Sequence, residues 1–339
     1  MRWPSTEAAD NHWPRRGWFR RAAMKTVARV RWVTCAPSRI RSVSIFRAKV
    51  ASFSSVKVSV RFYGTRGSRP VVGPDHAEFG GDTAFVVIEA GGEPVFLDLG
   101  TGMDAYARRL EAGQLVRASV LLSHYHFDHV QGLPFFTAVD VEGARLRIFT
   151  PGGPDPLERL FAPPFFPVSP LRFRGEISVA RVEEGRLELE ASRVEVLALE
   201  VPHTNTAFGY RIEAGGISIC YIPDHQAPCG LDFFDEKALR LAEGADLVIH
   251  DAQYSEVEFA AKCHWGHSTY GYAATLAHQA GAKHVVLFHH DPSRTDSDLL
   301  EVEKGLAARY APLGLRVTAA RQGGMILLSD EHAAAAGAL

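Results

Sequence analysis

Residues 120–129 read Val-Leu-Leu-Ser-His-Tyr-His-Phe-Asp-His, an apolar strand that runs directly into four potential metal ligands. Alternation at the end of a strand places His124 and His126 on one side, and the turn that follows brings Asp128 and His129 to a second position. Imidazole and carboxylate groups without a nearby thiolate suit zinc, manganese or iron. One loop can thus serve two adjacent metal ions, so we predict two divalent cations, with Zn²⁺ expected first and Mn²⁺ or Fe as alternatives.

Short apolar strands and helical stretches alternate on both sides of this segment. Short turns such as Gly91-Gly92 and Gly215-Gly216 join many early strands, which implies antiparallel pairing, and strand–helix alternation becomes clearer after residue 230. This mixture predicts an α/β fold in which outer helices cover the sheets, a layered sandwich. Strands are expected at 56–63, 84–90, 94–98, 118–123, 145–149, 193–201, 207–213, 217–222, 246–250, 284–288, 316–320 and 324–328, and helices at 103–112, 235–243, 254–262, 269–280 and 296–310.

The charge of the chain changes sharply after residue 55. Residues 1–55 hold 12 of the 37 Lys and Arg residues and two of the 39 acidic residues, so the remainder holds 25 basic against 37 acidic residues, a net of −12. We predict that residues 1–55 are a basic extension outside the fold, either disordered or the product of a mis-assigned start; a targeting leader and a basic arm are the alternatives. The folded domain is expected at 56–330 and a flexible tail at 331–339.

The same numbers exclude several classes of partner. An acidic body does not attract a phosphate backbone through its overall field, so no long nucleic acid is expected as a partner. No stretch approaches the length of an apolar membrane span. The four cysteines show no C-x-x-C pairing, which predicts no disulfide framework and suits the cytoplasm. Cys220 is expected to be buried, and Cys263-His264 does not have the spacing of a metal motif.

The pattern H-x-H-x-D-H at residues 124–129 resembles the signature of the metallo-β-lactamase superfamily, and four further motifs and a matching first loop extend the resemblance over residues 56–328. The resemblance implies an αββα sandwich in which the ends of apolar strands bring the ligands together. The supporting segments are Gly64-Thr65-Arg66-Gly67-Ser68, Leu97-Asp98-Leu99-Gly100-Thr101-Gly102, Val201-Pro202-His203, Ile222-Pro223-Asp224 and Phe288-His289-His290-Asp291-Pro292.

Carried over by position, this resemblance implies seven ligands for two metal ions. His289 and His290 are adjacent and point to different sides, and the family pattern favours His289. Asp98 is expected to accept a hydrogen bond from a ligand imidazole and so fix its tautomer, with a simple turn residue as the alternative. The implied ligands are His124, His126 and His203 at one metal and Asp128, His129 and His289 at the other, with Asp224 bridging both.

Trp265-Gly266-His267-Ser268 resembles the Gly-His-Ser element of the phosphodiesterase branch, which includes tRNase Z and the phosphoribosyl cyclic phosphodiesterases. There the histidine is linked to protonation of the leaving group. The resemblance implies catalytic roles for His267, as a proton donor, and for Asp128 in addition to its role as a ligand. The alternatives are that His267 is incidental and that Ser268 simply caps the following helix.

The interval between His203 and Asp224 indicates the kind of phosphodiester. In tRNase Z a long arm that grips tRNA lies there, whereas here the interval holds only two short strands and a turn. We therefore expect a small-molecule or short-oligonucleotide phosphodiester, cleaved by a metal-bridging hydroxide. The alternatives are a hydrolase of another ester, lactone or thioester, and a non-hydrolytic metal-binding sensor or redox protein.

Two further features concern the surroundings of the site. The apolar stretch Phe161–Pro167 is interpreted as a lid or wall of the pocket, as a contact in a homodimer, or as ordinary packing. Arg66 and Arg69 are the best cationic candidates for holding an anionic substrate, although ordinary surface arginines would look the same.

Overall fold

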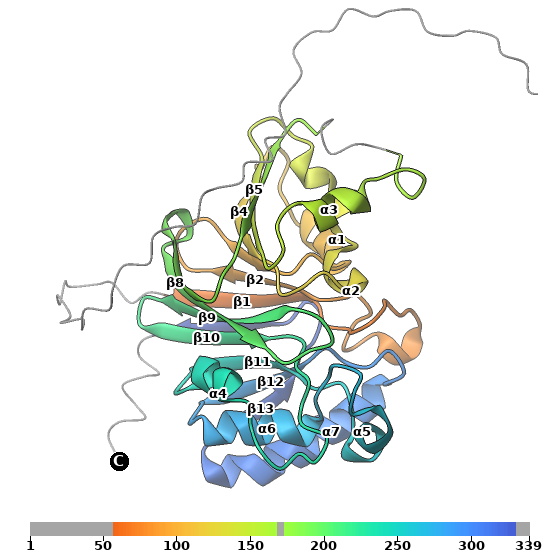
Figure 1. The fold of residues 1–339 in the computed structure, drawn as a ribbon, viewed down its shortest axis with the longest axis vertical. Helices are drawn as coiled ribbons and strands as arrows, with labels where there is room; N and C mark the ends of the chain where they lie inside the picture. Colours follow the sequence, from red (N-terminus) through yellow and green to blue (C-terminus); the bar gives the residue numbers. More distant parts are fainter. Residues whose placement is uncertain (1–56, 168–172, 330–339) are drawn as a thin grey trace, which may run out of the picture.

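The computed structural model describes residues 57–167 and 173–329, which form two seven-stranded sheets packed face to face (Figure 1). The extension 1–55 and the tail 331–339 lie outside the described residues. The first sheet has the strand order β14-β1-β2-β3-β4-β5-β6. Its strands are β1 (Lys57–Gly64), β2 (Phe85–Glu89), β3 (Val95–Leu97), β4 (Arg117–Leu121), β5 (Arg145–Thr150), β6 (Glu176–Arg181) and β14 (Met325–Ser329).

The second sheet repeats the pattern of the first, with the order β13-β12-β11-β10-β9-β8-β7. In both sheets four consecutive strands are parallel, β3 to β6 in the first and β10 to β13 in the second. The other pairs are antiparallel. The strands are β7 (Gly185–Leu189), β8 (Val194–Val201), β9 (Ala207–Ala214), β10 (Ile217–Ile222), β11 (Leu247–Asp251), β12 (His284–Phe288) and β13 (Arg316–Ala319).

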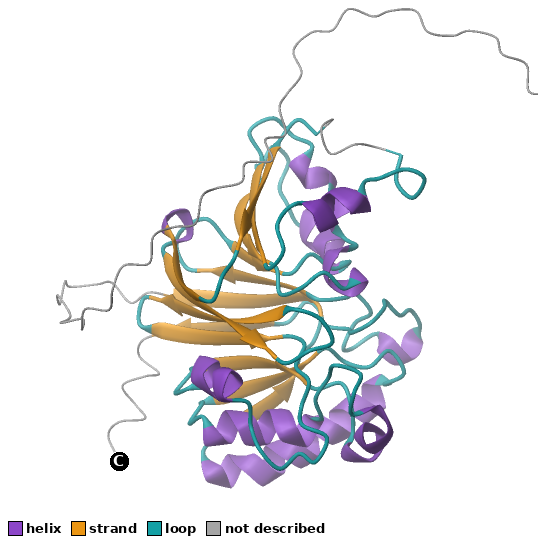
Figure 2. Ribbon diagram, in the orientation of Figure 1, coloured by secondary structure: helices purple, strands orange, loops and turns teal. Residues whose placement is uncertain are grey.

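Helices cover the outer face of each sheet, which gives the four layers of an αββα sandwich (Figure 2). The side chains between the sheets form one apolar cluster, and each sheet packs a second cluster against its own helices. Polar caps start the helices on the second sheet, for example the capping boxes of Ser255 and Thr295. The helices are α1 (Gly102–Ala107), α2 (Phe127–Val130) and α3 (Asp155–Leu160) on the first sheet, and α4 (Glu236–Ala242), α5 (Glu256–Lys262), α6 (Tyr270–Gln279) and α7 (Asp296–Tyr310) on the second.

The strand directions bring five strand ends to one edge of the sandwich. β10, β11 and β12 are parallel, and β8 runs in the same direction because two antiparallel pairings separate it from β10. In the first sheet, β4 ends just before the His-rich loop at residues 124–129. Parallel sheets place polar side chains at the carboxyl ends of their strands, where ligands bind. The predicted ligands therefore meet where the two sheets face each other.

The predicted α/β sandwich is confirmed, and the predicted elements agree with the structure to within a few residues. The helix expected at 103–112 ends at Ala107. β6, β7, α2 and α3 were not predicted. β6 and β7 are edge strands that alternate polar and apolar residues without a continuous apolar run, and α2 and α3 have only four and six residues. Among the described residues, no helix is long and apolar enough to cross a membrane.

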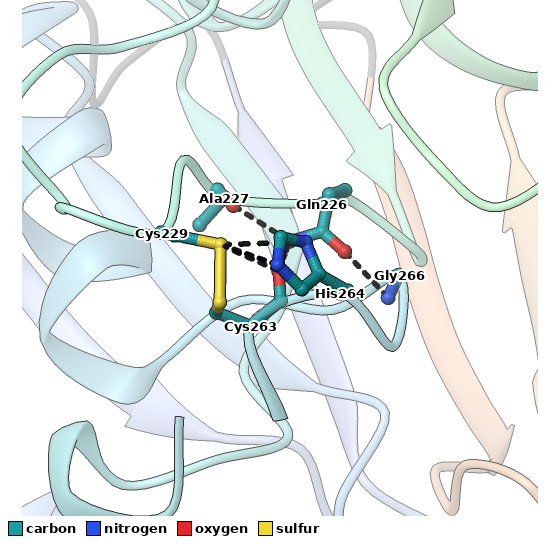
Figure 3. Close-up of a disulfide and its surroundings, with 6 residues drawn as sticks. All are labelled: Gln226, Ala227, Cys229, Cys263, His264 and Gly266. Carbon is teal, nitrogen blue, oxygen red and sulfur yellow. Dashed lines mark hydrogen bonds between the residues drawn. A yellow bond between two sulfur atoms is a disulfide. The ribbon is translucent and has the colours of Figure 1, made fainter. Parts of the chain in front are cut away.

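The prediction about cysteines is wrong at one point. Cys220 is fully buried, as expected, but Cys229 and Cys263 form a disulfide (Figure 3). The two residues lie 34 positions apart on separate loops that meet only in the folded chain. Spacing along the sequence could not reveal this pair, because no short motif links its members.

Candidate metal centre

Three of the predicted ligands form one half of the centre. His124 and His126 follow β4, and His203 follows β8 on the opposite sheet. His203 Nε2 lies 3.1 Å from His126 Nδ1, and the rings of His124 and His203 are 4.7 Å apart. His124 is completely buried. The fold thus joins imidazoles from both sheets into one cluster.

The other half of the centre contains Asp128, His129 and His289. His289 Nε2 lies 3.0 Å from Asp128 Oδ2 and 3.1 Å from His129 Nε2. His289 directly follows β12 and adopts a positive φ of 59°, a conformation that is uncommon for a residue with a side chain. The neighbouring His290 points away and lies 2.9 Å from the carbonyl oxygen of Ala320. Of the two adjacent histidines, only His289 reaches this cluster.

Asp224 lies between the two halves. Its Oδ1 is 3.8 Å from His124 Nε2 and 3.9 Å from His203 Nε2. Its Oδ2 is 3.0 Å from His129 Nε2 and 3.4 Å from His289 Nε2. Each carboxylate oxygen therefore faces a different half, which is the arrangement required of a bridging ligand.

In the neutral imidazoles of His129 and His203, the nitrogen that points into the centre carries a lone pair that can bind a metal ion. His129 Nδ1 donates to Asp98, His203 Nδ1 donates to the carbonyl oxygen of Gly266, and their Nε2 atoms face the centre. His129 Nε2 and His289 Nε2 lie 3.1 Å apart. Such a contact between two nitrogen lone pairs is repulsive unless a proton or a metal cation lies near both. His124 Nε2 is buried and has no hydrogen-bond partner among the described residues, and the nearest carboxylate oxygen, Asp224 Oδ1, lies 3.8 Å away. The donor set, its geometry and this unpartnered nitrogen all fit divalent metal ions.

The protonation states also suit metal binding, which requires neutral imidazole and ionised carboxylate. Burial, together with the neighbouring imidazoles, holds the pKa of His124 well below its usual value. Burial would raise the pKa of Asp224, but the surrounding imidazoles hold it well below its usual range. His129 is the exception: burial would lower its pKa, but Asp128, Asp224 and Asp98 raise it well above the usual value, so a metal ion that binds Nε2 must displace a proton. An acidic cage of this kind attracts cations.

Asp98 behaves as predicted, because it accepts a hydrogen bond of 2.8 Å from His129 Nδ1. It also accepts from the backbone nitrogen and the hydroxyl of Ser123 and from the Tyr221 hydroxyl. The Ser123 hydroxyl lies 3.0 Å from His124 Nδ1, and Gln253 Oε1 lies 2.9 Å from His289 Nδ1. Ser123 and Gln253 were not predicted, because a hydroxyl or an amide that supports an imidazole leaves no pattern in the sequence.

Two glycines allow the backbone to pack directly against the imidazoles. A Cβ atom at Gly67 would lie 2.4 Å from the His289 ring, and one at Gly266 would lie 2.6 Å from the His203 ring. Both distances are too short for any side chain. The loop that contains Gly67 also contributes Ser68, whose backbone nitrogen donates to Asp128 Oδ2 at 2.7 Å. This explains in physical terms why the loop after β1 belongs to the site.

His267 lies at the edge of the centre. The residue is 8 % exposed, and its Nδ1 lies 3.1 Å from Asp251 Oδ2. Asp251 ends β11 and was not predicted, although its position at a strand end is the same signal that identified Asp224. Burial would lower the pKa of His267, but Asp251 and the other nearby carboxylates raise it. His267 Nδ1 also lies 3.5 Å from Asp224 Oδ1. The structure therefore brings His267 next to the predicted bridging residue.

Several sequence interpretations need correction. Thr269, rather than Ser268, caps α6, and the Ser268 hydroxyl donates to the carbonyl oxygen of His225 instead. Arg66 is completely buried and donates to backbone carbonyl oxygens of Gly80, Asp291 and Arg294. It therefore holds loops together and cannot reach a substrate.

The apolar stretch Phe161–Pro167 divides between the core and the surface. Phe161 is buried in the cluster under the first sheet, whereas Phe165 is 88 % exposed. Phe166 packs against Phe135 and Phe161. Packing explains the first part of the stretch, and its exposed end leaves the lid and dimer interpretations as predictions.

The fold and the site together define a metal-dependent hydrolase built on an αββα sandwich. Residues 95–290 match the model of a beta-lactamase superfamily domain, and the chain belongs to this superfamily. A ribonuclease Z from Methanosarcina acetivorans is 26 % identical over 291 residues, which span 70 % of this chain and 88 % of that protein.

Two solved structures show the same fold. The metallo-beta-lactamase fold protein YhfI from Bacillus subtilis has a TM-score of 0.62 and 18 % identity, over 80 % of this chain and all of that one (100 %). A diphosphatase from the PhnP family has a TM-score of 0.60 and 19 % identity, over 81 % of this chain and 99 % of that one. The match of residues 95–290 to the family model confirms the predicted membership of the metallo-β-lactamase superfamily.

Proposed function

We propose that this protein is a two-metal phosphodiesterase whose substrate is a small molecule or a short oligonucleotide. The observation behind this proposal is the His267–Asp251 pair beside a two-part centre that Asp224 connects. A metal-binding sensor needs no proton donor at its metals, whereas hydrolysis of a phosphodiester with a basic leaving group does. The ribonuclease Z relative supports phosphodiester chemistry.

The proposed ligands are those implied by the sequence, with Zn²⁺ as the first expectation for both metals. When bound, the two cations would supply Lewis-acid activation of water and neutralise charge on the phosphoryl oxygens. Asp224 sets the separation of the two halves, because its two oxygens face them individually. Asp128 acts as a ligand held in place by the backbone nitrogen of Ser68.

His267 is the proposed proton donor to the leaving oxygen. Asp251 accepts from His267 Nδ1, which fixes the orientation of the ring and favours its protonated form. Asp251 is itself held by backbone donors, from His225 at 3.0 Å and from Ser268 at 3.2 Å. A ring fixed in this way can present its second nitrogen to a substrate without reorganisation.

The substrate class follows from the surroundings of the centre. The interval between His203 and Asp224 contains the antiparallel pair β9 and β10, which belongs to the second sheet and leaves no chain for a substrate-gripping arm. The acidic charge of residues 56–339 also disfavours a long nucleic acid. A second candidate is RNA processing, favoured by the name of the ribonuclease Z relative.

Turnover of three phosphodiesters by the zinc-loaded full-length protein tests the proposal. We expect hydrolysis of bis(p-nitrophenyl) phosphate and of a cyclic or dinucleotide phosphodiester, and little cleavage of a precursor tRNA. Asp224→Asn should abolish both the activity and binding of the metal pair, whereas the control Asp104→Asn changes an exposed carboxylate and should preserve both. Hydrolysis of carboxylic esters or lactones alone would contradict the proposal, and efficient tRNA cleavage would favour the second candidate.

Three other assignments remain part of the proposal. A cytoplasmic location is expected from the sequence, a homodimer is one interpretation of the exposed end of Phe161–Pro167, and the catalytic domain is assigned to 56–330. Sedimentation of the purified chain would determine its oligomeric state.

A further inference from the structure

A second group of metal-ligand atoms lies on the surface, apart from the centre described above. Cys229 and Cys263 form the disulfide, with their Cα atoms 5.0 Å apart, and His264 lies against it (Figure 3). His264 Nδ1 is 3.5 Å from Cys229 Sγ. We propose that these three residues, once the disulfide is reduced, form a third metal site that binds zinc or another thiophilic divalent cation.

The distances fit tetrahedral coordination. With Zn–S of about 2.3 Å and Zn–N of about 2.0–2.1 Å, a sulfur and a nitrogen that bind the same zinc ion at a tetrahedral angle lie about 3.6 Å apart. The Cys229 Sγ–His264 Nδ1 distance of 3.5 Å already has this value. One donor atom from each of the three residues lies within 4.8 Å of the others. Zinc can therefore bind with only a local adjustment of the sulfur atoms.

Exposure supports a site that exchanges metal and reductant with solvent. Cys229 and His264 are exposed, and Cys263 is half-buried. A cation bound here would have protein donors on one side and an open fourth position on the other, which water can fill. Two thiolates and one imidazole also differ in chemistry from the imidazole and carboxylate ligands of the first centre, and soft donors select thiophilic ions.

The chemistry balances in two steps. Two thiols, or one dithiol, reduce the disulfide: two electrons and two protons pass to Cys229 and Cys263, and the reductant becomes a disulfide. The two cysteine thiols then release their protons as their sulfur atoms bind the cation. In a reducing compartment the dithiol form predominates, so the metal-bound state is the one expected there.

The site is also connected to the proposed active-site loop. Gln226 Nε2 donates to the carbonyl oxygen of Cys263 at 2.5 Å, and Gln226 Oε1 accepts from the backbone nitrogen of Gly266 at 2.6 Å. The carbonyl oxygen of Gly266 in turn accepts from His203 Nδ1. Either the disulfide or a bound cation ties the loop before His267 to the loop after Asp224. The site can thus keep the same tether in oxidising and reducing conditions.

Cobalt binding to the full-length protein provides the test. A Co²⁺–thiolate bond produces an intense charge-transfer band in the near ultraviolet, which the centre of imidazoles and carboxylates cannot produce. Protein reduced with a phosphine, which takes oxygen from water as it gives two electrons to the disulfide, should bind one more equivalent of Co²⁺ than oxidised protein. That additional equivalent should produce the band.

Variants assign the band to its ligands. Cys229→Ser and Cys263→Ser should lose the band and the additional equivalent but keep the metals of the first centre. The matched controls Cys35→Ser and Cys220→Ala should keep both the band and the additional equivalent of Co²⁺. His264→Ala changes an exposed side chain, so the fold should be unaffected. It should weaken Co²⁺ binding by at least about tenfold, because even the loss of a residue that only supports a metal ligand lowers metal affinity by about 10- to 100-fold.

Three results would overturn the proposal. They are the absence of the band in reduced wild-type protein, its persistence in both cysteine variants, and resistance of the disulfide to reduction in the folded chain, as measured by mass spectrometry of alkylated protein. None of these results bears on the phosphodiesterase proposal, because that activity depends on different ligands and is measured separately.

Discussion

Replacing Asp98 with asparagine should weaken metal binding at the half of the centre that contains His129 and His289. Asp98 adopts a positive φ of 61°, where asparagine is well tolerated, so the backbone does not oppose the change. Its carboxylate accepts four hydrogen bonds, of which three go to Oδ2: those from His129, Tyr221 and the Ser123 hydroxyl. The substitution removes the charge of this acceptor and keeps its shape.

The magnitude follows from the hydrogen bond to His129. A hydrogen bond to a charged acceptor contributes about 1.5–3 kcal/mol, and a neutral one about 0.5–1.5 kcal/mol, so the bond loses about 1–1.5 kcal/mol. This loss corresponds to about 5- to 13-fold in metal affinity. If the amide nitrogen faces His129 instead, the His129 imidazole loses its acceptor and the effect rises towards about 100-fold, the upper end for residues that support a ligand.

The assay is a titration of zinc-loaded protein with a competing chelator. One of the two equivalents should bind about 5- to 100-fold more weakly in Asp98→Asn, while the other changes much less. In a His289→Ala background, where this half is already disabled, adding Asp98→Asn should have little further effect. Asn205→Ala provides the comparison, because its side-chain nitrogen lies 3.0 Å from His126 Nε2 in the other half. An equal loss at both equivalents, or the same loss in the His289→Ala background, would refute the assignment of Asp98 to His129.

Three further predictions concern catalysis, stability and the ends of the chain. His267→Ala should keep both metals but slow turnover of substrates with poor leaving groups by about 10²–10⁴-fold, and p-nitrophenyl esters much less; an equal loss on both in steady-state kinetics would indicate positioning instead. Burial and then Arg316 lower the pKa of His284 from 6.5 to about 3, so the unfolded chain binds the proton more tightly and stability falls as pH drops through 6.5 towards 3. Between pH 7 and pH 5 this amounts to about 2 kcal/mol, and denaturant unfolding of His284→Gln at the two values should show a correspondingly smaller decrease. Truncation to 56–339 should leave folding and hydrolysis intact, because β1 begins at Lys57; an insoluble or metal-free product would show that the extension belongs to the fold.

The parts of the site that could be predicted from sequence share one property. The ligands that the family resemblance implied on the second sheet, His203, Asp224 and His289, each lie within two residues of the end of an apolar strand, and these strand ends meet at one edge. His203, Asp224 and His289 came together for this reason although they are far apart in the chain. Asp251 satisfies the same rule at the end of β11 and was overlooked only because it matched no motif.

Other features depend on contacts that have no local pattern. The pairing of Cys229 with Cys263 and the hydrogen bond from His289 to Gln253 exist only because separate loops meet. Arg66 illustrates the opposite error, because an arginine in a loop near the site looks like a substrate contact until its burial is known. Sequence reasoning therefore recovered residues that contact the proposed metals better than residues that position them.

The division of ligands between the sheets has a thermodynamic consequence. His124 to His129 follow a strand of the first sheet, whereas His203, Asp224 and His289 follow strands of the second. Cations bound by both groups of ligands would cross-link the two sheets. Part of the free energy of metal binding would then stabilise the packing of one sheet against the other. For a saturated site, each tenfold rise in free metal concentration adds about 1.4 kcal/mol to the free energy of unfolding. The melting temperature of this protein should therefore rise with the concentration of free metal in its surroundings.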